Sequence, residues 1–327
     1  MIDMNKTLDI IVTHYKEPWE TGEKFFQMLD LQRMVDWDQI GVIVINDGTE
    51  NRLPCRCFTG RPYSVIQSSI EQSGVSAARN EGIRRSCAEW IMFCDFDDLF
   101  ANVYALKVLM DILPAPNHDI LWADFIAEND KGLSIRSRNN VFNHAKLYRR
   151  QYILDLGLWF NEDMCFNEDR LFNSLALLYA DPARTGRINS PYPLYVWAYN
   201  PQSVTHSPER YVKNRIGIYR GNKILCEAYE KDASPEDFHA MCIRAMVDAY
   251  YTFNVRVLSP ELEKLLPEIA EFYRAHKQDD FNVDGNTLQQ IADQSHKDYL
   301  AGLYDGMDEG FLIREDISLA DWLEGLK

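Results

Sequence analysis

Three aspartates follow an apolar run in the segment IMFCDFDDLF, residues 91–100: Asp95, Asp97 and Asp98. Side chains in a β-strand repeat every two residues, so Asp95 and Asp97 can face the same ligand. Two carboxylates this close repel each other unless a positive charge lies nearby, and a hard divalent cation with oxygen ligands provides one. The segment therefore predicts a partial Mg²⁺ or Mn²⁺ shell that phosphate oxygens and water complete. Asp98 has a second interpretation, as the N-cap of a helix that begins near Ala101.

A glycine-containing segment, EQSGVSAARNEGIRRS (71–86), lies just upstream of these aspartates. Small residues follow its glycine and lead into an expected helix that carries Arg79, Arg84 and Arg85. The N-terminus of a helix favours anions, and Arg79 can add a charge-assisted hydrogen bond to a phosphate. We interpret Arg84 and Arg85 as surface charge.

The elements that must position these residues are predicted by apolar runs that alternate with helical segments between residues 8 and 125. Such alternation indicates βαβ units, and runs that are apolar on both faces are typical of a covered, parallel sheet. Ligands of open α/β sheets bind outside the carboxyl ends of the strands, so the polar segments that follow three of the runs are the candidate site. The strands are expected at 8–12, 40–45, 63–67, 90–94 and 119–124, the helices at 21–35, 75–87 and 102–112, and the polar segments at 13–18, 46–50 and 95–98.

The region after residue 125 departs from this alternation. Lys131 and Gly132 have the residue types of a hairpin tip, so an antiparallel edge is expected there. The segment YPLYVWAYN (192–200) alternates with period two and reads as a further strand, with Tyr195, Trp197 and Tyr199 on one face. These aromatic side chains could line a sugar site, but ordinary packing of a strand face is the favoured interpretation.

The last third of the sequence is helical and acidic, with helices expected at about 210–230, 235–255, 260–277, 286–303 and 317–325. Residues 211–327 contain 22 acidic and 13 basic residues, so they carry −9 of the net charge of −16. We therefore predict two domains, an α/β domain over 1–208 and an acidic helical module over 209–327. The excess charge is most simply a solvated surface, and the helices are a candidate surface for self-association or for a partner protein.

Composition excludes several other classes of protein. A 46% hydrophobic, 26% charged sequence is typical of a globular chain. The net charge of −16 disfavours nucleic acid as a partner, because phosphate binding relies on Lys and Arg. No run approaches the ~20 apolar residues of a membrane helix. The N-terminal segment lacks the pattern of a signal peptide, and the seven scattered cysteines fit reduced thiols, so a cytoplasmic location is expected.

Four segments in this order resemble the family 2 glycosyltransferases: IVTHYKE, VIVINDGTEN, EQSGVSAARNEGIRRSCAEWIMFCDFDD and LYRRQYILDLGLWFNEDMCFNEDRLFN. The resemblance covers about residues 8–205, and the order and spacing of the segments carry it. It implies the GT-A fold, which is Rossmann-like with a mostly parallel central sheet and an antiparallel edge. It also implies an inverting transfer of a sugar from a nucleotide donor, a UDP-sugar on family grounds, to a hydroxyl of a glycan, a protein or another acceptor.

The resemblance also implies roles for individual residues. Asp97 would bind the Mn²⁺ or Mg²⁺ ion that bridges the diphosphate, and His206 in the segment SVTHS would be a further metal ligand. Asp169 would be the general base, with Glu168 beside it in the segment NEDR. The nucleotide-sugar would be bound by Thr13, Tyr15, Glu17, Asp47, Arg79 and Asp95, with Asp47 on the base and Asp95 at the ribose.

The sequence departs from the family pattern at two places. Thr13 and His14 stand where a proline is common, and Asn46 stands where an aspartate is common. Neither change removes a group that the chemistry requires, but both lie beside the expected base-binding region.

Two alternatives belong to other functional classes. The pattern of Asp95 and Asp97 also resembles the haloacid dehalogenase phosphatases, but that family needs glycine and threonine just after the pair, where this sequence has Asp98 and Leu99. The fold could also serve only as a non-catalytic nucleotide-sugar-binding or scaffolding domain. The presence of every charged group that the transferase mechanism needs argues against that interpretation.

Overall fold

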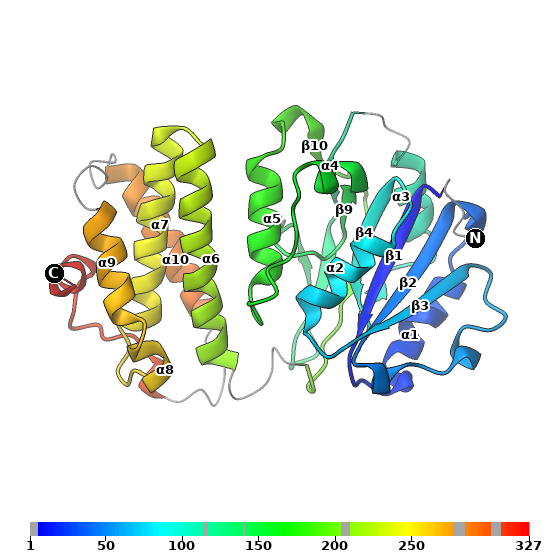
Figure 1. The fold of residues 1–327 in the computed structure, drawn as a ribbon, viewed down its shortest axis with the longest axis horizontal. Coiled ribbons are helices and arrows are strands. Elements are labelled where there is room, and N and C mark those ends of the chain that lie inside the picture. The colour runs from blue at the N-terminus through cyan, green and yellow to red at the C-terminus, as the bar shows by residue number, and fades with distance from the viewer. Residues whose placement is uncertain are drawn as a thin grey trace. The chain divides into compact units, whose positions relative to one another are not determined.

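The computed structural model describes residues 6–113, 117–139, 141–203, 210–276, 285–301 and 309–326. Within these ranges the chain forms two compact units, residues 1–207 and 208–327 (Figure 1). That the regions 1–208 and 209–327 are independent domains, each folding by itself, stays a prediction. None of the helices in the described ranges is both long and apolar enough to cross a membrane.

A seven-stranded mixed sheet forms the centre of the first unit, in the order β10-β6-β9-β4-β1-β2-β3. The strands β4, β1, β2 and β3 run parallel, whereas β9 is antiparallel to both of its neighbours. The antiparallel pairing therefore lies toward one edge of a mostly parallel sheet, as expected. The strands are β1 (Leu8–His14), β2 (Ile40–Asp47), β3 (Ser64–Ile70), β4 (Trp90–Asp95), β6 (Ile120–Trp122), β9 (Lys146–Arg149) and β10 (Thr185–Arg187).

Helices cover both faces of this sheet, which explains why its central strands are apolar throughout. On one face, side chains of β1, β2 and β4 pack against α1 (Trp19–Asp30) and α3 (Ala105–Ile112). On the other face they pack against α2 (Val75–Arg85), α4 (Arg150–Asp155) and α5 (Glu168–Leu178). Because β1, β2, β3 and β4 are parallel, their carboxyl ends lie at the same side of the sheet, where the polar segments follow them (Figure 1).

A second, four-stranded sheet has the order β5-β11-β7-β8 and was not predicted as a separate sheet. The hairpin expected at Lys131 and Gly132 is present, because β7 and β8 are antiparallel and Gly132 has a φ of 71°. The strand expected within 192–200 is also present, but it is short. The four strands are β5 (Leu99–Phe100), β7 (Phe125–Glu128), β8 (Ser134–Ser137) and β11 (Tyr195–Trp197).

The second unit is helical over its described residues. Its longest helices pack against each other, and α7 also packs against α9, α10 and α11. Ser234 caps α7 by accepting a hydrogen bond from the Asp237 amide, and proline occupies the first turn, as is common at helix starts. The helices are α6 (Arg210–Asp232), α7 (Pro235–Phe253), α8 (Pro260–Glu263), α9 (Leu266–His276), α10 (Gly285–Ala301) and α11 (Leu319–Gly325).

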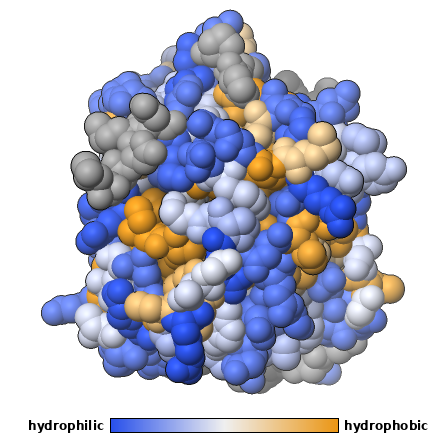
Figure 2. All heavy atoms as spheres, turned by 90° about the vertical axis from the view of Figure 1, so that its right-hand side faces the viewer, coloured by the Kyte–Doolittle hydropathy of each residue, from blue (hydrophilic) through white to orange (hydrophobic). Residues whose placement is uncertain are grey.

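On the face of the molecule that Figure 2 shows, apolar side chains form small groups among hydrophilic ones. Exposed large apolar residues of the first unit include Leu31, Met34 and Tyr104. Met34 and Tyr104 directly follow Arg33 and Val103, whose backbones are joined by a hydrogen bond from the Arg33 amide to the Val103 carbonyl. Scattered exposed apolar side chains are normal on a globular surface.

Candidate active site

The two positions that depart from the family pattern are in contact with each other. His14 at the end of β1 places Nδ1 3.0 Å from Oδ1 of Asn46 at the end of β2, and both side chains are buried. Asn46 also donates to the Ser68 carbonyl at 2.8 Å, and its Oδ1 accepts from the Leu53 amide at 3.3 Å. This network fixes the ends of β1, β2 and β3, and therefore gives the unusual residues a shared structural role.

The first expected nucleotide-binding segment lies directly after β1. Glu17 accepts a hydrogen bond from the Tyr15 amide at 2.9 Å, which closes a tight loop. The Tyr15 hydroxyl accepts from Nε2 of Gln72 at 2.7 Å, so this loop contacts the segment that precedes α2. Thr13 lies opposite Asp95 in the sheet and its side chain is hydrogen-bonded to that carboxylate. These expected binding residues therefore border one edge of the sheet.

Asp47 holds the loop at the start of α2. Its two carboxylate oxygens accept from the backbone amides of Ser73 at 2.7 Å and Gly74 at 3.0 Å. Gly74 has a φ of 92°, a conformation that favours glycine. Each oxygen keeps a further lone pair for a ligand. The contact thus joins the segment after β2 to the loop that begins the arginine-bearing helix.

Arg79 connects three parts of the candidate site. Its Nη1 donates to Glu168 at 2.7 Å and its Nη2 donates to Asp95 at 3.1 Å, while its own side chain is only 7% exposed. Burial alone would raise the pKa of Asp95, but the Arg79 guanidinium, with smaller contributions from His144 and Thr13, holds it below its usual value. The end of β4, helix α2 and the start of α5 are therefore joined by one buried cation.

Asp97 has no cationic partner among the contacts described for it. Its Oδ2 accepts from Nδ2 of Asn200 at 2.8 Å. Burial, followed by the charges of Asp95 and Glu17, raises the pKa of Asp97 to about 6, and the Asn200 contact only partly offsets this. Phe96, between the two aspartates, is buried against Gly22 of α1, so the pair sits on a packed support. A carboxylate destabilised in this way is a good ligand for a hard cation.

Asp98 does not cap a helix, so that interpretation was wrong. Residues 99–100 form β5 and the next helix begins only at Ala105. The buried Asp98 carboxylate instead accepts from the Tyr195 hydroxyl at 2.7 Å and from the Ala198 amide at 3.0 Å. Burial, together with Asp95 and Asp97, raises its pKa well above the ordinary value. Asp98 thus ties β11 of the second sheet to the end of β4.

The expected general base lies in the first turn of α5. Asp169 is half-buried, and its neighbour Glu168 is buried against Arg79. Burial and the charge of Glu168 raise the pKa of Asp169 to about 7, while Arg79 opposes the shift. Asn167, just before this pair, has a left-handed φ of 61°. A carboxylate with a pKa near 7 is well matched to accept a proton at neutral pH.

His144 lies beside the aspartates and was not singled out by the sequence. Its Nδ1 is 3.7 Å from Asp98, and its ring stacks on Trp197 with the centroids 5.2 Å apart. Asp95, Asp98 and His144 place possible ligand atoms within 4.8 Å of one another. Burial lowers the pKa of His144 to about 4. Among the described residues, Asp95, Asp98 and His144 therefore form one candidate cation site, although the Asp98 oxygens already accept hydrogen bonds from Tyr195 and Ala198.

Several partners in this network carry no local sequence signal. Tyr195 belongs to the aromatic face for which packing was the favoured interpretation, and its burial confirms that packing. Its hydrogen bond to Asp98 joins residues 97 positions apart, which no short pattern encodes. His144 and Asn200 are single polar residues in loops. His206, the expected further metal ligand, lies outside the described residues.

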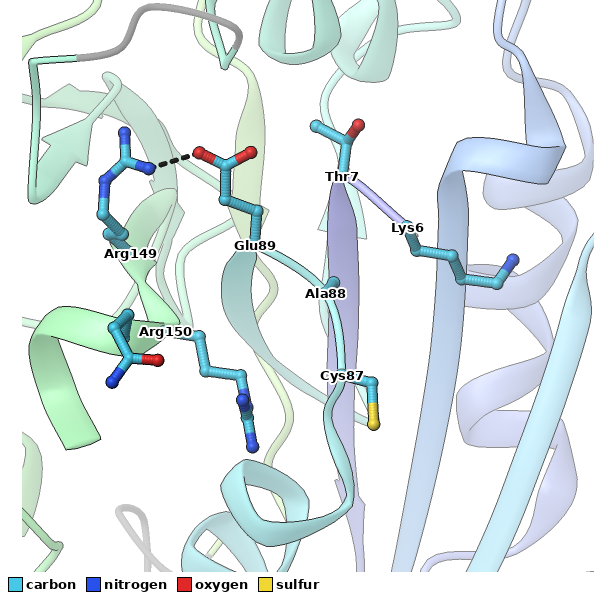
Figure 3. A pocket seen from close by; sticks show the side chains of 8 residues that line it. Lys6, Thr7, Cys87, Ala88, Glu89, Arg149 and Arg150 are labelled. Carbon is cyan, nitrogen blue, oxygen red and sulfur yellow. Dashed lines mark hydrogen bonds and ion pairs between the residues drawn. The ribbon is translucent and has the colours of Figure 1, made fainter. Parts of the chain in front are cut away.

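A surface cavity of about 420 Å³ lies at the opposite edge of the sheet. Figure 3 shows Lys6, Thr7, Glu89, Arg149 and Arg150 around it, with Glu89 paired to Arg149. Lys6 and Thr7 precede β1, Glu89 precedes β4, and the remaining two residues lie where β9 ends and α4 begins. The cavity is therefore at the amino ends of the parallel strands, away from the carboxyl ends where open α/β sheets bind ligands.

The mostly parallel sheet with an antiparallel edge is the GT-A fold of glycosyltransferases. Residues 9–178 match the profile of the family described as Glycosyl transferase family 2, and the chain belongs to that family. An uncharacterized glycosyltransferase of Haemophilus influenzae is 30% identical over 115 residues, which cover 35% of this chain and 37% of the relative. YwdF of Bacillus subtilis, also an uncharacterized glycosyltransferase, is 29% identical over 31% of this chain and 34% of the relative. The chain thus matches about a third of the length of these relatives.

Solved structures share the fold at low sequence identity. Residues 1–349 of S. aureus TarS in complex with UDP superpose with a TM-score of 0.51 and 18% identity, covering 95% of this chain and all of that one. The mannosyltransferase PcManGT from Pyrobaculum calidifontis, in complex with GDP-Man and Mn²⁺, gives a TM-score of 0.52 and 14% identity, covering 90% and 86%. At this level of identity the likeness establishes the fold alone.

Proposed function

We propose that this protein transfers a sugar from a nucleotide donor, a UDP-sugar, to an acceptor hydroxyl with inversion at the anomeric carbon. The observation that carries the proposal is the placement of Asp169, whose pKa is raised to about 7, one residue from the Glu168 that Arg79 joins to Asp95. Ligands of open α/β sheets bind at the carboxyl ends of the strands, and the position of Asp169 near that end supports it as the base. TarS with UDP and PcManGT with GDP-Man support a nucleotide-sugar donor.

In the proposed reaction, Asp169 accepts the proton of the acceptor hydroxyl as its oxygen attacks the anomeric carbon. The bond from that carbon to the diphosphate breaks, and the diphosphate leaves with the electron pair. Asp97 and Asp95 are the residues that would hold a divalent cation. When bound, the cation would stabilise the charge that develops on the diphosphate. The Mn²⁺ bound by PcManGT supports such an ion.

Arg79 has a different proposed role from simple phosphate binding, because its guanidinium already contacts two carboxylates. It keeps Asp95 ionised and holds Glu168 at the start of α5. Thr13, Tyr15, Glu17 and Asp47 are proposed to border the nucleotide. His206 remains a proposed further ligand.

The proposal is tested by incubating the protein with UDP- and GDP-sugars, with and without Mn²⁺. We expect stabilisation in a thermal-shift measurement by one nucleotide series, and slow Mn²⁺-dependent hydrolysis of that donor in the absence of acceptor. A scaffolding protein would bind a nucleotide-sugar without hydrolysing it, and a phosphatase would instead cleave phosphomonoesters. Absence of both binding and hydrolysis across the panel would refute the proposed function.

A further inference from the structure

We propose that Lys146 is a positioning residue for the candidate base, holding the Asp169 carboxylate in place and in its charged form. The proposal deepens the function proposed above and rests on it. The resemblance and the sequence patterns give Lys146 no role. Its side chain is 0% exposed, although it is a lysine at the first position of β9.

The geometry of β9 and α5 supports a placement of Lys146 near Asp169. Lys146 and Tyr148 are two residues apart on β9, so their side chains leave the strand on the same side. Asp169 and Asn173 are four residues apart on α5, so they share one face of that helix. The Tyr148 hydroxyl is hydrogen-bonded to Oδ1 of Asn173. One step further along both elements, the same two faces bring Lys146 toward Asp169.

The direction of the elements agrees with this placement. Because β9 is antiparallel to β4, its first residue lies toward the carboxyl end of β4, where the candidate site is. Asp169 lies in the first turn of α5, next to the Glu168 that Arg79 joins to Asp95. Both members of the proposed pair are therefore at the site end of their elements.

The backbone around Lys146 is also specified closely. Ala145 has a left-handed φ of 54°, a conformation unfavourable for a residue with a Cβ atom. The Lys146 amide donates to the Asn143 carbonyl at 3.1 Å, and the Asn143 side chain accepts from Asn173 of α5 at 3.1 Å. The turn that begins β9 is thus tied to the helix that carries Asp169. A strained turn of this kind persists only where surrounding contacts determine it.

The charges around the pair explain why a cation is needed there. Asp169 faces the acids Glu168 and Asp95, and Arg79 is the cation that opposes them. Tyr148, buried on β9, also interacts with the Asp169 charge. Burial lowers the pKa of Lys146 to about 7, and Asp169 is the charged group that counteracts this shift. A buried lysine is costly without a partner, and the half-buried Asp169 carboxylate offers the opposite charge that offsets this cost.

A kinetic experiment tests this role with Lys146→Met, which keeps most of the side-chain volume, and Lys146→Arg, which keeps the charge. Without the cation, ionisation of Asp169 is harder, so the acid limb of the kcat/KM profile should move up by about one pH unit or more. At pH 6.5 this corresponds to a loss of about tenfold, which decreases as the pH rises. The donor KM should stay within about twofold, because the donor contacts are unchanged.

The arginine variant should keep its acid limb within about half a pH unit of the wild type even if its rate is lower, since its charge is retained. A methionine variant whose acid limb does not move would overturn the proposal. So would a change confined to the donor KM, because it would place Lys146 in donor binding.

A second experiment does not depend on activity. The unfolding of Lys146→Met, Asp169→Asn and the double variant is compared with the wild type in urea at pH 7, where both side chains carry charge. If the two side chains interact, the double variant should be more stable than the sum of the single changes predicts, by about fivefold or more in the folded-to-unfolded ratio. Additive effects would refute the pair.

If Lys146→Met folds only when Asp169 is also changed, that rescue supports the pair. Failure of the methionine variant in both backgrounds would contradict it. A protein that shows the coupling but neither binds nor hydrolyses any nucleotide-sugar would refute the proposed function and leave the pair intact.

Discussion

Replacing Arg79 by alanine should weaken the first unit far more than loss of an ordinary surface arginine. The change removes the cation that bonds Glu168 at 2.7 Å and Asp95 at 3.1 Å. The Glu168 side chain is 10% exposed and that of Asp95 is 36% exposed, so water relieves mainly the latter. Breaking a buried ion pair by removing one partner typically costs about 3–5 kcal/mol, and the exposure of Asp95 favours the lower end, about 3 kcal/mol.

The pH dependence of this loss has a defined sign. In the wild type the pKa of Asp95 is lowered, so the stability that it contributes is present above its unfolded pKa and is lost as the pH falls through its folded pKa. In the variant, burial without the cation raises the pKa values of the carboxylates. They then bind protons as the pH falls from 8 to 5, which relieves the repulsion. The destabilisation should therefore be largest at pH 8 and smaller at pH 5.

Urea unfolding followed by tryptophan fluorescence is the suitable assay, because six of the seven tryptophans lie within residues 1–207. Arg84→Ala is the matched control on the same helix. Its side chain is 52% exposed, its nearest acidic partner, Glu81, is 3.4 Å away, and its loss should cost less than about 0.5 kcal/mol. Equal stability of the two variants, or a loss for Arg79→Ala that does not depend on pH, would refute the reasoning.

Three further predictions concern the chemistry and its support. Asp97→Ala should abolish Mn²⁺-dependent transfer in a donor-turnover assay without unfolding the protein, since it removes a carboxylate that its neighbours repel. The control Asp163→Ala, at an exposed position, should keep both activity and melting temperature. Full transfer by Asp97→Ala would contradict the metal assignment. The wild-type pH–rate profile should rise through about pH 7 as Asp169 ionises. Asp169→Asn should still bind nucleotide in a thermal-shift assay but should lose transfer. Loss of nucleotide binding in this variant would exclude the base role. Gly22→Ala would place a Cβ 2.2 Å from the buried ring of Phe96, so calorimetry should show destabilisation by about 1–3 kcal/mol, and an unchanged melting temperature would refute this packing.

The sequence predicts the central sheet well because its parallel strands are covered on both faces. The five predicted apolar runs correspond to β1, β2, β3, β4 and β6, and the predicted helix over 75–87 corresponds to α2. The expected helix over 260–277 is interrupted, since α8 ends at Glu263 and α9 begins at Leu266. The hairpin at Lys131 and Gly132 and the strand within 192–200 were predicted, but their union with β5 in a second sheet was not, because β5 has only two residues and its partner β11 lies far along the chain.

The candidate site was only partly predictable for a different reason. Residue types at strand ends indicated where charged groups gather, and the structure brings Thr13, Arg79, Asp95 and Glu168 into contact. Which charge neutralises which depends on tertiary contacts between distant segments. The error at Asp98 shows this clearly, because its actual partner Tyr195 lies 97 residues away.

The bridge made by Arg79 also has a consequence for the order of folding. Its two bonds close loops of 16 and 89 residues, and the longer one cannot form until α5 has docked on the sheet. Before then Asp95, Glu168 and Asp169 are apart and hydrated, so their mutual repulsion does not hinder collapse of the parallel strands. We expect the charged centre to assemble after the folding transition state, so that Arg79→Ala mainly accelerates unfolding and leaves the folding rate nearly unchanged.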